Sequence, residues 1–265
     1  MPYRRLPNTE TARYKALKIA LQKGEDLPPY KLPYSQKSLR QLRGFLPEYE
    51  RQFKQLQEAK NVIIAKSKKY YELQKKAKIY ISHFIQIMNF SIIRGELKPI
   101  ARTFYGLKEN DCKIPKINTE IDLIKWGEIM INGEPERIAQ GGNPVTNPTI
   151  AVVKVRYDQF IDAYRHQNTL RNSYKRLSDK IADMRSEADS IILNIWNEVE
   201  VFYNEFPDKE KRDKTKEYGI IYFFRKSEKN RINKTGNKEE VDVLLKNSTK
   251  KKRIDSQFSL SLFKD

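Results

Sequence analysis

Cysteine and histidine are scarce in this 265-residue chain, which holds one cysteine and two histidines. A single cysteine, Cys112, excludes an internal disulfide, so the fold cannot depend on an oxidising compartment. His83 and His166 fall on two different predicted helices, and neither follows a glutamate by the three residues that a di-metal bundle site requires. We therefore expect no metal site, and we interpret both histidines as ordinary core or surface residues.

Long apolar runs are also missing. The most apolar window, residues 79–93, is interrupted by five polar side chains and is shorter than the ~20 residues of a membrane-spanning helix. The first fifteen residues lack the apolar segment of a signal peptide and include Glu10. These features predict a cytoplasmic protein for which a membrane is an improbable partner.

Recognisable reaction centres are absent as well. The stretch RIAQGGNPVTNPT, residues 137–149, is rich in glycine and proline, but it matches neither the phosphate-binding loop nor the dinucleotide-binding fingerprint. Its residues suit a connector in which glycines follow one helix, Asn147 caps the next and Pro148 opens it. An anion at that helix N-terminus stays the alternative.

Catalytic groups have no supporting neighbours in the sequence. Cys112 has no nearby histidine, and the acidic side chains of residues 179–200 alternate with basic ones, as on a solvated helix face. The sequence predicts no catalytic residue, no cofactor and no enzyme.

Glycine and proline are missing from two long stretches, and these stretches carry helical periodicity. The first stretch, residues 47–93, opens with Pro47 and has no further proline or glycine, and apolar or aromatic side chains recur in it every seven residues: Tyr49, Leu56, Ile63, Tyr70, Ala77 and Phe84. Residues 148–206 carry a second such row, Val153, Phe160, Gln167, Tyr174, Ile181, Ala188, Ile195 and Phe202. We predict one long helix over each stretch, although the β-branched start of the second, 149–157, would also suit a strand.

The remaining segments are shorter. We expect a basic helix over 8–24, an extended connector over 25–35, a short helix after Ser35 and a helix over about 120–132 that bends before Gly141. Residues 218–225 are the best strand candidate, and most of the polar tail beyond them is expected to be disordered.

The predicted fold class is therefore all-α: an elongated helical bundle built on a long antiparallel hairpin, with a small β element near the C-terminus. We expect a basic arm with short helices over 1–46, the bundle over 47–206 with its connecting segment at 94–147, and a basic C-terminal segment over 207–265.

Acidic residues are too few to neutralise the basic ones. The chain has 52 lysines and arginines and 34 aspartates and glutamates, which gives a net charge of +18. The excess lies in residues 1–93 and 207–265. Such a field favours polyanions, and a Lys/Tyr-rich helix can contact phosphates while stacking on bases. The candidate nucleic-acid-binding residues are Arg4, Arg5, Lys66, Lys68, Lys69, Tyr71, Lys75, Lys76, Lys250, Lys251, Lys252 and Arg253.

Two functions follow from these patterns. The first is a non-enzymatic helical scaffold or interaction protein that assembles with another protein or with itself through apolar helix stripes. The second is sequence-independent nucleic-acid binding through the basic arms and the Lys/Tyr stretch. Apolar side chains exposed on a long helix would favour the first.

Overall fold

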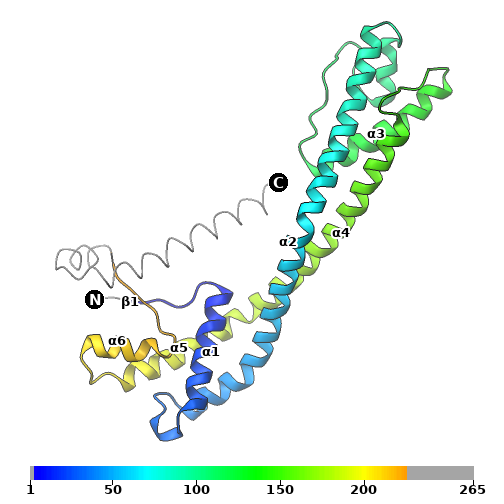
Figure 1. The fold of residues 1–265 in the computed structure, drawn as a ribbon. Helices are drawn as coiled ribbons and strands as arrows, with labels where there is room; N and C mark the ends of the chain where they lie inside the picture. The colour runs from blue at the N-terminus through cyan, green and yellow to red at the C-terminus, as the bar shows by residue number, and fades with distance from the viewer. Residues whose placement is uncertain (1–2, 226–265) are drawn as a thin grey trace. The chain divides into compact units, whose positions relative to one another are not determined.

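The computed structural model describes residues 3–225, and these residues form an all-α fold with one small sheet (Figure 1). The predicted fold class is confirmed. In chain order, the elements are strand β1 (Tyr3–Arg4), helix α1 (Glu10–Asp26), a 3-10 turn (Pro29–Lys31), α2 (Gln36–Ile93), a 3-10 helix (Pro99–Tyr105), α3 (Glu120–Ala139), α4 (Ile150–Asp183), α5 (Arg185–Phe202), α6 (Asp208–Lys216) and β2 (Tyr222–Phe223).

The contacts divide the chain into two compact units. The first unit draws on both ends of the chain, up to Gln57 and from Leu177 on, and the second is Glu58–Arg176. Helices α2 and α4 each contribute residues to both units. None of the helices in the described range combines the length and the apolar character needed to cross a membrane.

The first unit is built where α1 meets α5. Leu17 of α1 and Trp196 of α5 are almost fully buried. Arg13 of α1 donates two hydrogen bonds to the Asp189 carboxylate of α5, at 2.8 and 3.0 Å. Strand β1 pairs with β2 in an antiparallel register that sets Tyr3 opposite Phe223, so the N-terminal strand is tied to a segment more than 200 residues later.

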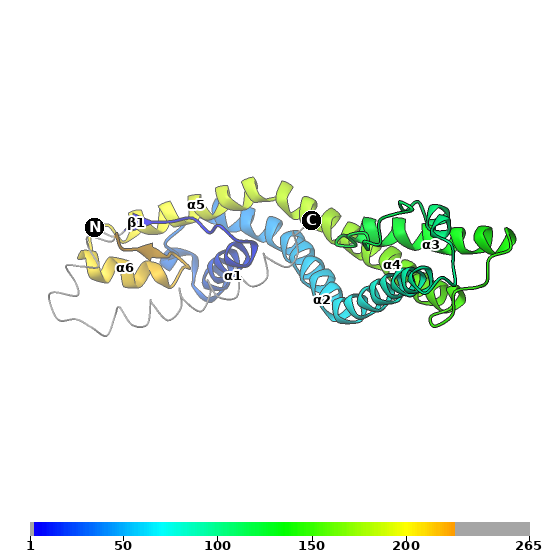
Figure 2. The same ribbon diagram turned by 90° about the horizontal axis from the view of Figure 1, so that it is seen from above.

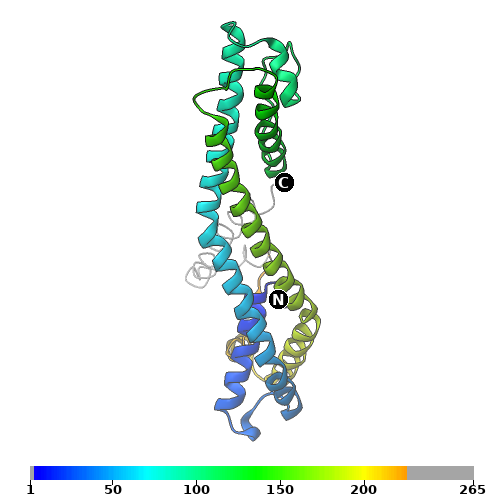
Figure 3. The same cartoon turned by 90° about the vertical axis from the view of Figure 1, so that its right-hand side faces the viewer.

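In the second unit, α2 and α4 run side by side in opposite directions (Figures 1 and 3). The Tyr70 ring of α2 lies tilted beside the Phe160 ring of α4, with centroids 6.3 Å apart. Further along α2, the Tyr80 ring lies 5.5 Å from the guanidinium of Arg156, which comes earlier in α4. The antiparallel helical hairpin is thereby confirmed. Its apolar core holds Tyr70, Ala77, Ile81, Phe84, Ile85, Met88, Tyr105, Ile117, Leu123, Met130, Val145, Val153, Tyr157 and Phe160.

Helix α3 packs against α4 in the same unit (Figure 2). The Tyr157 ring lies over Gly127, where an added Cβ would stand 2.2 Å from two ring carbons. The Tyr157 hydroxyl donates to the carbonyl oxygen of Ile124 at 3.2 Å. The predicted cap of α3 is also present, because Thr119 and Asp122 exchange the two hydrogen bonds of a capping box.

The start of α2 differs from the prediction. One helix runs from Gln36 to Ile93 and passes through Pro47, which was expected to begin a helix after a separate short one. The Ser35 hydroxyl accepts from the Ser38 amide at 3.2 Å and caps this longer helix. Leu42, Phe45, Leu46 and Tyr49 are buried on both sides of the proline. Their burial offsets the hydrogen bond that a proline removes from a helix interior.

The predicted helix over 148–206 is two helices in the structure. Helix α4 ends at Asp183 and α5 begins at Arg185, with Met184 between them. The β-branched start of α4 is helical, not a strand. Asn147 does not cap it: this residue has a φ of 60° and precedes a cis peptide bond to Pro148. The Thr149 carbonyl instead accepts the first hydrogen bonds, from Val152 and Val153.

The connector between α3 and α4 is fastened by buried polar groups. Gly141 follows α3 with a φ of +85°, as a glycine after a helix end commonly does. Glu134 and Arg137, which form a bidentate ion pair at 2.8 and 2.9 Å, then reach the loop. Arg137 donates to the Asn143 carbonyl at 2.7 Å, and the Val145 amide donates to Glu134 at 2.8 Å. The stretch is a connector held by its own helix.

The C-terminal part also departs from the prediction. The charged run after Pro207, for which no helix was predicted, forms α6. The strand predicted over 218–225 is reduced to the two residues of β2. The tail that was expected to be mostly disordered lies outside the described residues, as do Lys250, Lys251, Lys252 and Arg253.

Candidate interaction surface

The two N-terminal candidate residues, Arg4 and Arg5, differ in whether their guanidinium groups have partners within the first unit. Arg4 donates to Glu200 at 2.9 Å and to Asn197 at 2.6 Å, so its guanidinium ties β1 to α5. Arg5 is exposed. One of the two therefore contributes to the first unit's structure.

The candidate residues of the Lys/Tyr stretch are all exposed on α2 within the second unit. They do not form one patch, because each residue turns a helix by about 100°. That rotation sets Lys68, Tyr71 and Lys75 on one side of α2, together with Lys78, whereas Lys69 and Lys76 point to another side and Lys66 to a third.

The two adjacent tyrosines of this stretch have different roles. Tyr70 is buried, and its hydroxyl donates a hydrogen bond to the Glu120 carboxylate at 2.5 Å. Arg171 of α4 donates to the same carboxylate. Burial first and the Glu120 hydrogen bond second raise the pKa of Tyr70 far above its usual value. Tyr71 is half exposed. Only Tyr71 is therefore available to a partner.

A stripe of exposed apolar side chains, interrupted by lysines, follows the side of α2 that carries Tyr71. Its exposed side chains are Ile64, Tyr71, Ile79, Phe90 and Ile93. Successive members of this set are seven, eight, eleven and three residues apart in sequence. Such spacings keep side chains on one side of a helix, and this side faces away from the buried row. Together with Lys68, Lys75 and Lys78 they define what we call the outer face of α2, which extends over ~43 Å of helix.

Among the described residues, the lysines of the outer face have no acidic ion-pair partner. None of Lys68, Lys75 and Lys78 forms an ion pair within residues 3–225. Two hollows adjoin them. One of about 220 Å³ lies between Tyr71, Lys75, Lys78 and the start of α3 at Thr119. Another of about 530 Å³ follows α2 past Ile79 and His83. The outer face thus alternates apolar and lysine side chains along one side of the helix, and the exposed Glu72 lies on the same side, one heptad before Ile79.

A second surface of the same unit has the opposite charge. Glu128 of α3 and Asp158 and Asp162 of α4 line an open depression of about 570 Å³, which we call the acidic depression. Its apolar lining is Ile124 and Ile161, both half-buried. Arg165 at its edge is the one basic residue among the side chains that line it.

The carboxylates of the acidic depression affect a neighbouring phenol. Burial raises the pKa of Tyr157 to about 12, and the nearby Glu128 and Asp158 carboxylates act in the same direction. A phenol next to several carboxylates stays neutral at physiological pH, so it adds no further negative charge. The charge of the depression comes from its three carboxylates.

Sequence reasoning named Lys68, Tyr71 and Lys75 of the outer face but not its other apolar side chains, and it missed the acidic depression. The seven-residue rows that it followed are the buried ones, and Ile64, Tyr71 and Ile79 belong to a third row with longer steps. The spacing of Asp158 and Asp162 by four residues was the available signal for one carboxylate-bearing helix side. Glu128 could not be joined to them without knowing that α3 packs on α4.

Groups suited to metal binding do not gather in the described part of the chain. No cluster of three or more histidine, cysteine and acidic side chains there has the geometry to hold a metal ion. His83, His166 and Cys112 are all exposed.

Comparison with known proteins adds no relative. No family model, no curated protein and no solved structure matches this chain. The site must therefore be interpreted from its own residues.

Proposed function

We propose that this protein is a non-enzymatic helical scaffold that assembles with copies of itself. The supporting observation is that one compact unit exposes two surfaces of opposite charge, each of which combines apolar and charged side chains: the outer face of α2 and the acidic depression. The outer face of one copy would dock on the acidic depression of the next. Apolar contact would supply most of the affinity, and the charges would select the pairing.

Like charges argue against pairing two identical surfaces. Two outer faces in contact would bring Lys68, Lys75 and Lys78 of one copy towards those of the other. Juxtaposed like charges cost several kcal/mol at an interface. A contact between two different surfaces propagates from copy to copy, closing into a ring or continuing as a filament.

Charge reversal on the full chain tests this proposal. We expect Lys75→Glu with Lys78→Glu to leave the protein monomeric in sedimentation velocity, because the outer face would then repel the acidic depression. Asp158→Lys with Asp162→Lys should have the same effect from the other side. An equimolar mixture of the two double variants should assemble again, since each then offers the surface that the other has lost.

The matched control is Lys69→Glu with Lys76→Glu, which changes the same charge on the same helix but on another side. This variant should assemble as the unmodified chain does. A monomeric unmodified chain at all concentrations, or loss of assembly in the control as well, would refute the proposal.

Nucleic-acid binding is the second candidate, and a specific observation favours it. Lys68, Tyr71, Lys75 and Lys78 share one side of α2, which is the arrangement that stacks a base while neutralising phosphates. Binding of a labelled random single strand should then weaken by orders of magnitude between about 50 and 200 mM salt.

The same variants separate the two functions. Nucleic-acid binding through the outer face would be lost in the Lys75/Lys78 variant and kept, or strengthened, in the Asp158/Asp162 variant. Self-assembly would be lost in both. No anisotropy change at the lowest salt would remove nucleic acid as a candidate.

A further inference from the structure

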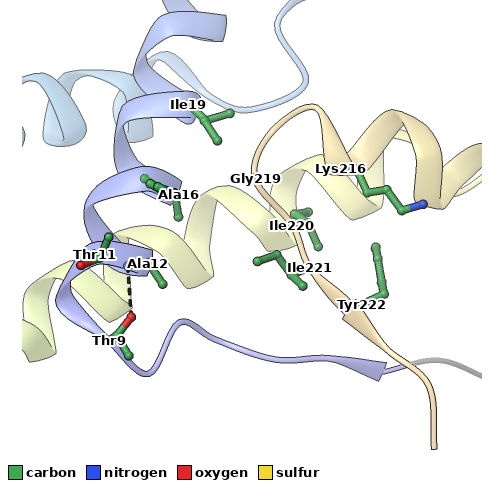
Figure 4. Close-up of a pocket in the computed structure, with 11 residues that line it drawn as sticks. Thr9, Thr11, Ala12, Ala16, Ile19, Lys216, Gly219, Ile220, Ile221 and Tyr222 are labelled. Atoms are coloured by element: carbon green, nitrogen blue, oxygen red, sulfur yellow. Dashed lines mark hydrogen bonds between the residues drawn. The ribbon is translucent and has the colours of Figure 1, made fainter. Parts of the chain in front are cut away.

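A groove of about 700 Å³ lies in the first unit, well apart in sequence from the outer face of α2 (Figure 4). One wall is α1, from Thr9 to Ile19. The other wall is the stretch from Lys216 to Tyr222 that leads from α6 into β2. Both walls therefore come from the ends of the chain.

The groove has an apolar lining and a floor of small residues. Ala12 and Ala16 line it from α1, and Gly219 lines it from the opposite wall. Gly219 approaches so closely that a Cβ there would lie 3.4 Å from the Ala16 Cα, and its φ of +83° favours glycine. Ile19 is 37% exposed and Ile221 is 50% exposed. These isoleucines lie across the groove from each other (Figure 4).

The charged groups of the groove are confined to lysines. Lys15 and Lys216 are its two charged lining residues, and both are exposed. An occupant must therefore be predominantly apolar. Contact with the walls would then remove Ile19 and Ile221 from water, at about 25 cal/mol for each Å² of apolar surface buried.

The chain itself continues from one wall of the groove. Tyr222 lines it, and the described residues end three positions later, at Arg225, with forty residues still to follow. Among those forty, residues 256–263 are the longest run without a charge, and residues 258–262 alternate Phe, Ser, Leu, Ser, Leu. Alternation of apolar and polar residues is the pattern of an extended segment with one buried face.

We propose that residues 258–263 of the same chain bind in this groove as an extended segment, with Phe258, Leu260 and Leu262 towards the groove. The lengths agree: the α1 wall covers ~15 Å from Thr9 to Ile19, and five extended residues cover ~14 Å. Because both partners belong to one chain, the linker holds the segment near the groove at an effective concentration on the order of millimolar.

Disulfide trapping in the full chain tests this inference. Cys112→Ser removes the natural thiol, Ile221→Cys puts one thiol in the groove, and a second cysteine replaces one residue at a time from 258 to 262. We expect intramolecular disulfides to form with alternating rates along these five positions, because successive side chains of an extended segment point to opposite sides.

Ser248→Cys is the control position, since it is closer in sequence to the groove and lies outside the alternating segment. A segment that binds should react on the order of tenfold faster than this nearer control. Equal rates at all five positions, a faster reaction at Ser248→Cys, or disulfides that join two chains would overturn the proposal. The last result would assign the groove to a second copy.

A second measurement needs no cysteine. Leu260→Asp with Leu262→Asp should release the segment and raise the fluorescence of an apolar dye in the opened groove several-fold. Ser259→Asp with Ser261→Asp carries the same added charge on the other side of the segment and should leave the fluorescence unchanged. Equal dye binding in the two variants would contradict the proposal.

Discussion

Glu134 and Arg137 are the most consequential buried charges among the described residues. Both are nearly inaccessible to solvent, at 0% and 3% exposure. Besides its ion pair with Arg137, Glu134 accepts from the Tyr105 hydroxyl and the Val145 amide. A buried ion pair contributes little over an apolar pair of similar shape, but breaking it leaves one charge unpaired. The fixed connector is what the protein gains from this network.

Glu134→Gln should lower the free energy of unfolding by about 3–5 kcal/mol, because Arg137 would keep a buried and uncompensated charge. Denaturant unfolding at neutral pH measures the change. Glu136→Gln, on an exposed residue two positions away, is the matched control and should stay within about 0.5 kcal/mol of the unmodified chain. Equal effects of the two variants would show that the ion pair does not support the connector.

The same carboxylate predicts a pH dependence. Burial alone would raise the pKa of Glu134, but hydrogen bonds from Arg137, Tyr105 and Val145 outweigh burial and hold it below its usual value of 4.5. The folded-state pKa is therefore lower than that of the unfolded chain. The stabilisation is complete above the unfolded value and is lost as the pH falls through the folded value. Unfolding of Glu134→Gln should depend less on pH in that acidic range.

Two helical glycines should respond to alanine in opposite ways. Gly127 lies against the Tyr157 ring, which an added methyl group would have to displace. We expect Gly127→Ala to cost about 1–3 kcal/mol through overpacking. Gly44 has no atom within 4 Å of an added Cβ, so Gly44→Ala should stabilise α2 by about 0.5–1 kcal/mol. Thermal unfolding of both variants decides this, and a shift of the same sign would contradict the packing of α3 on α4.

At the scale of elements, the sequence specifies helix type well and helix ends poorly. The absence of glycine and proline, together with seven-residue rows, correctly indicates long helices in α2 and α4. Pro47 and Met184 show why the ends are harder to predict. A proline suits a first turn on local grounds, but buried side chains on both sides keep it inside a helix. Met184 carries no breaking signal, although the apolar register shifts close to it.

Pro47→Ala separates the two interpretations of this residue. In a helix interior, alanine restores a backbone hydrogen bond and relieves the contact of the ring with the preceding turn. The variant should therefore be more stable by about 1–3 kcal/mol in denaturant unfolding. At a first helical position the substitution would be neutral or slightly destabilising, and that result would contradict a continuous α2.

The candidate surface shows a similar limit of sequence reasoning. Six of the predicted residues lie close together in sequence and are exposed, but helix geometry distributes them over several sides of α2. The seven-residue row already separated Tyr70 from Tyr71, but the polar partners of Tyr70, Glu120 and Arg171, became known only from the structure. Contacts between segments far apart in the sequence decide which charges act together.

At the scale of the whole molecule, assembly between oppositely charged surfaces should depend on salt. Screening shortens the reach of charges from about 10 Å at 0.1 M to about 3 Å at 1 M salt. We expect the weight-average sedimentation coefficient of the full chain to fall as sodium chloride rises over that range. A coefficient that rises or stays constant would leave the apolar stripe, and not the charges, as the determinant of assembly.

The first unit takes residues from both ends of the chain, and this has a consequence for biosynthesis. The second unit, Glu58–Arg176, is a single stretch that can fold while the rest is still being made. Helix α1, by contrast, has to wait for α5, whose Asp189 accepts the hydrogen bonds of Arg13. At 5–20 residues per second this delay lasts roughly 10–30 s. Force measurements on stalled nascent chains should therefore record the second unit first, and α1 is the helix that would need protection from aggregation at the ribosome.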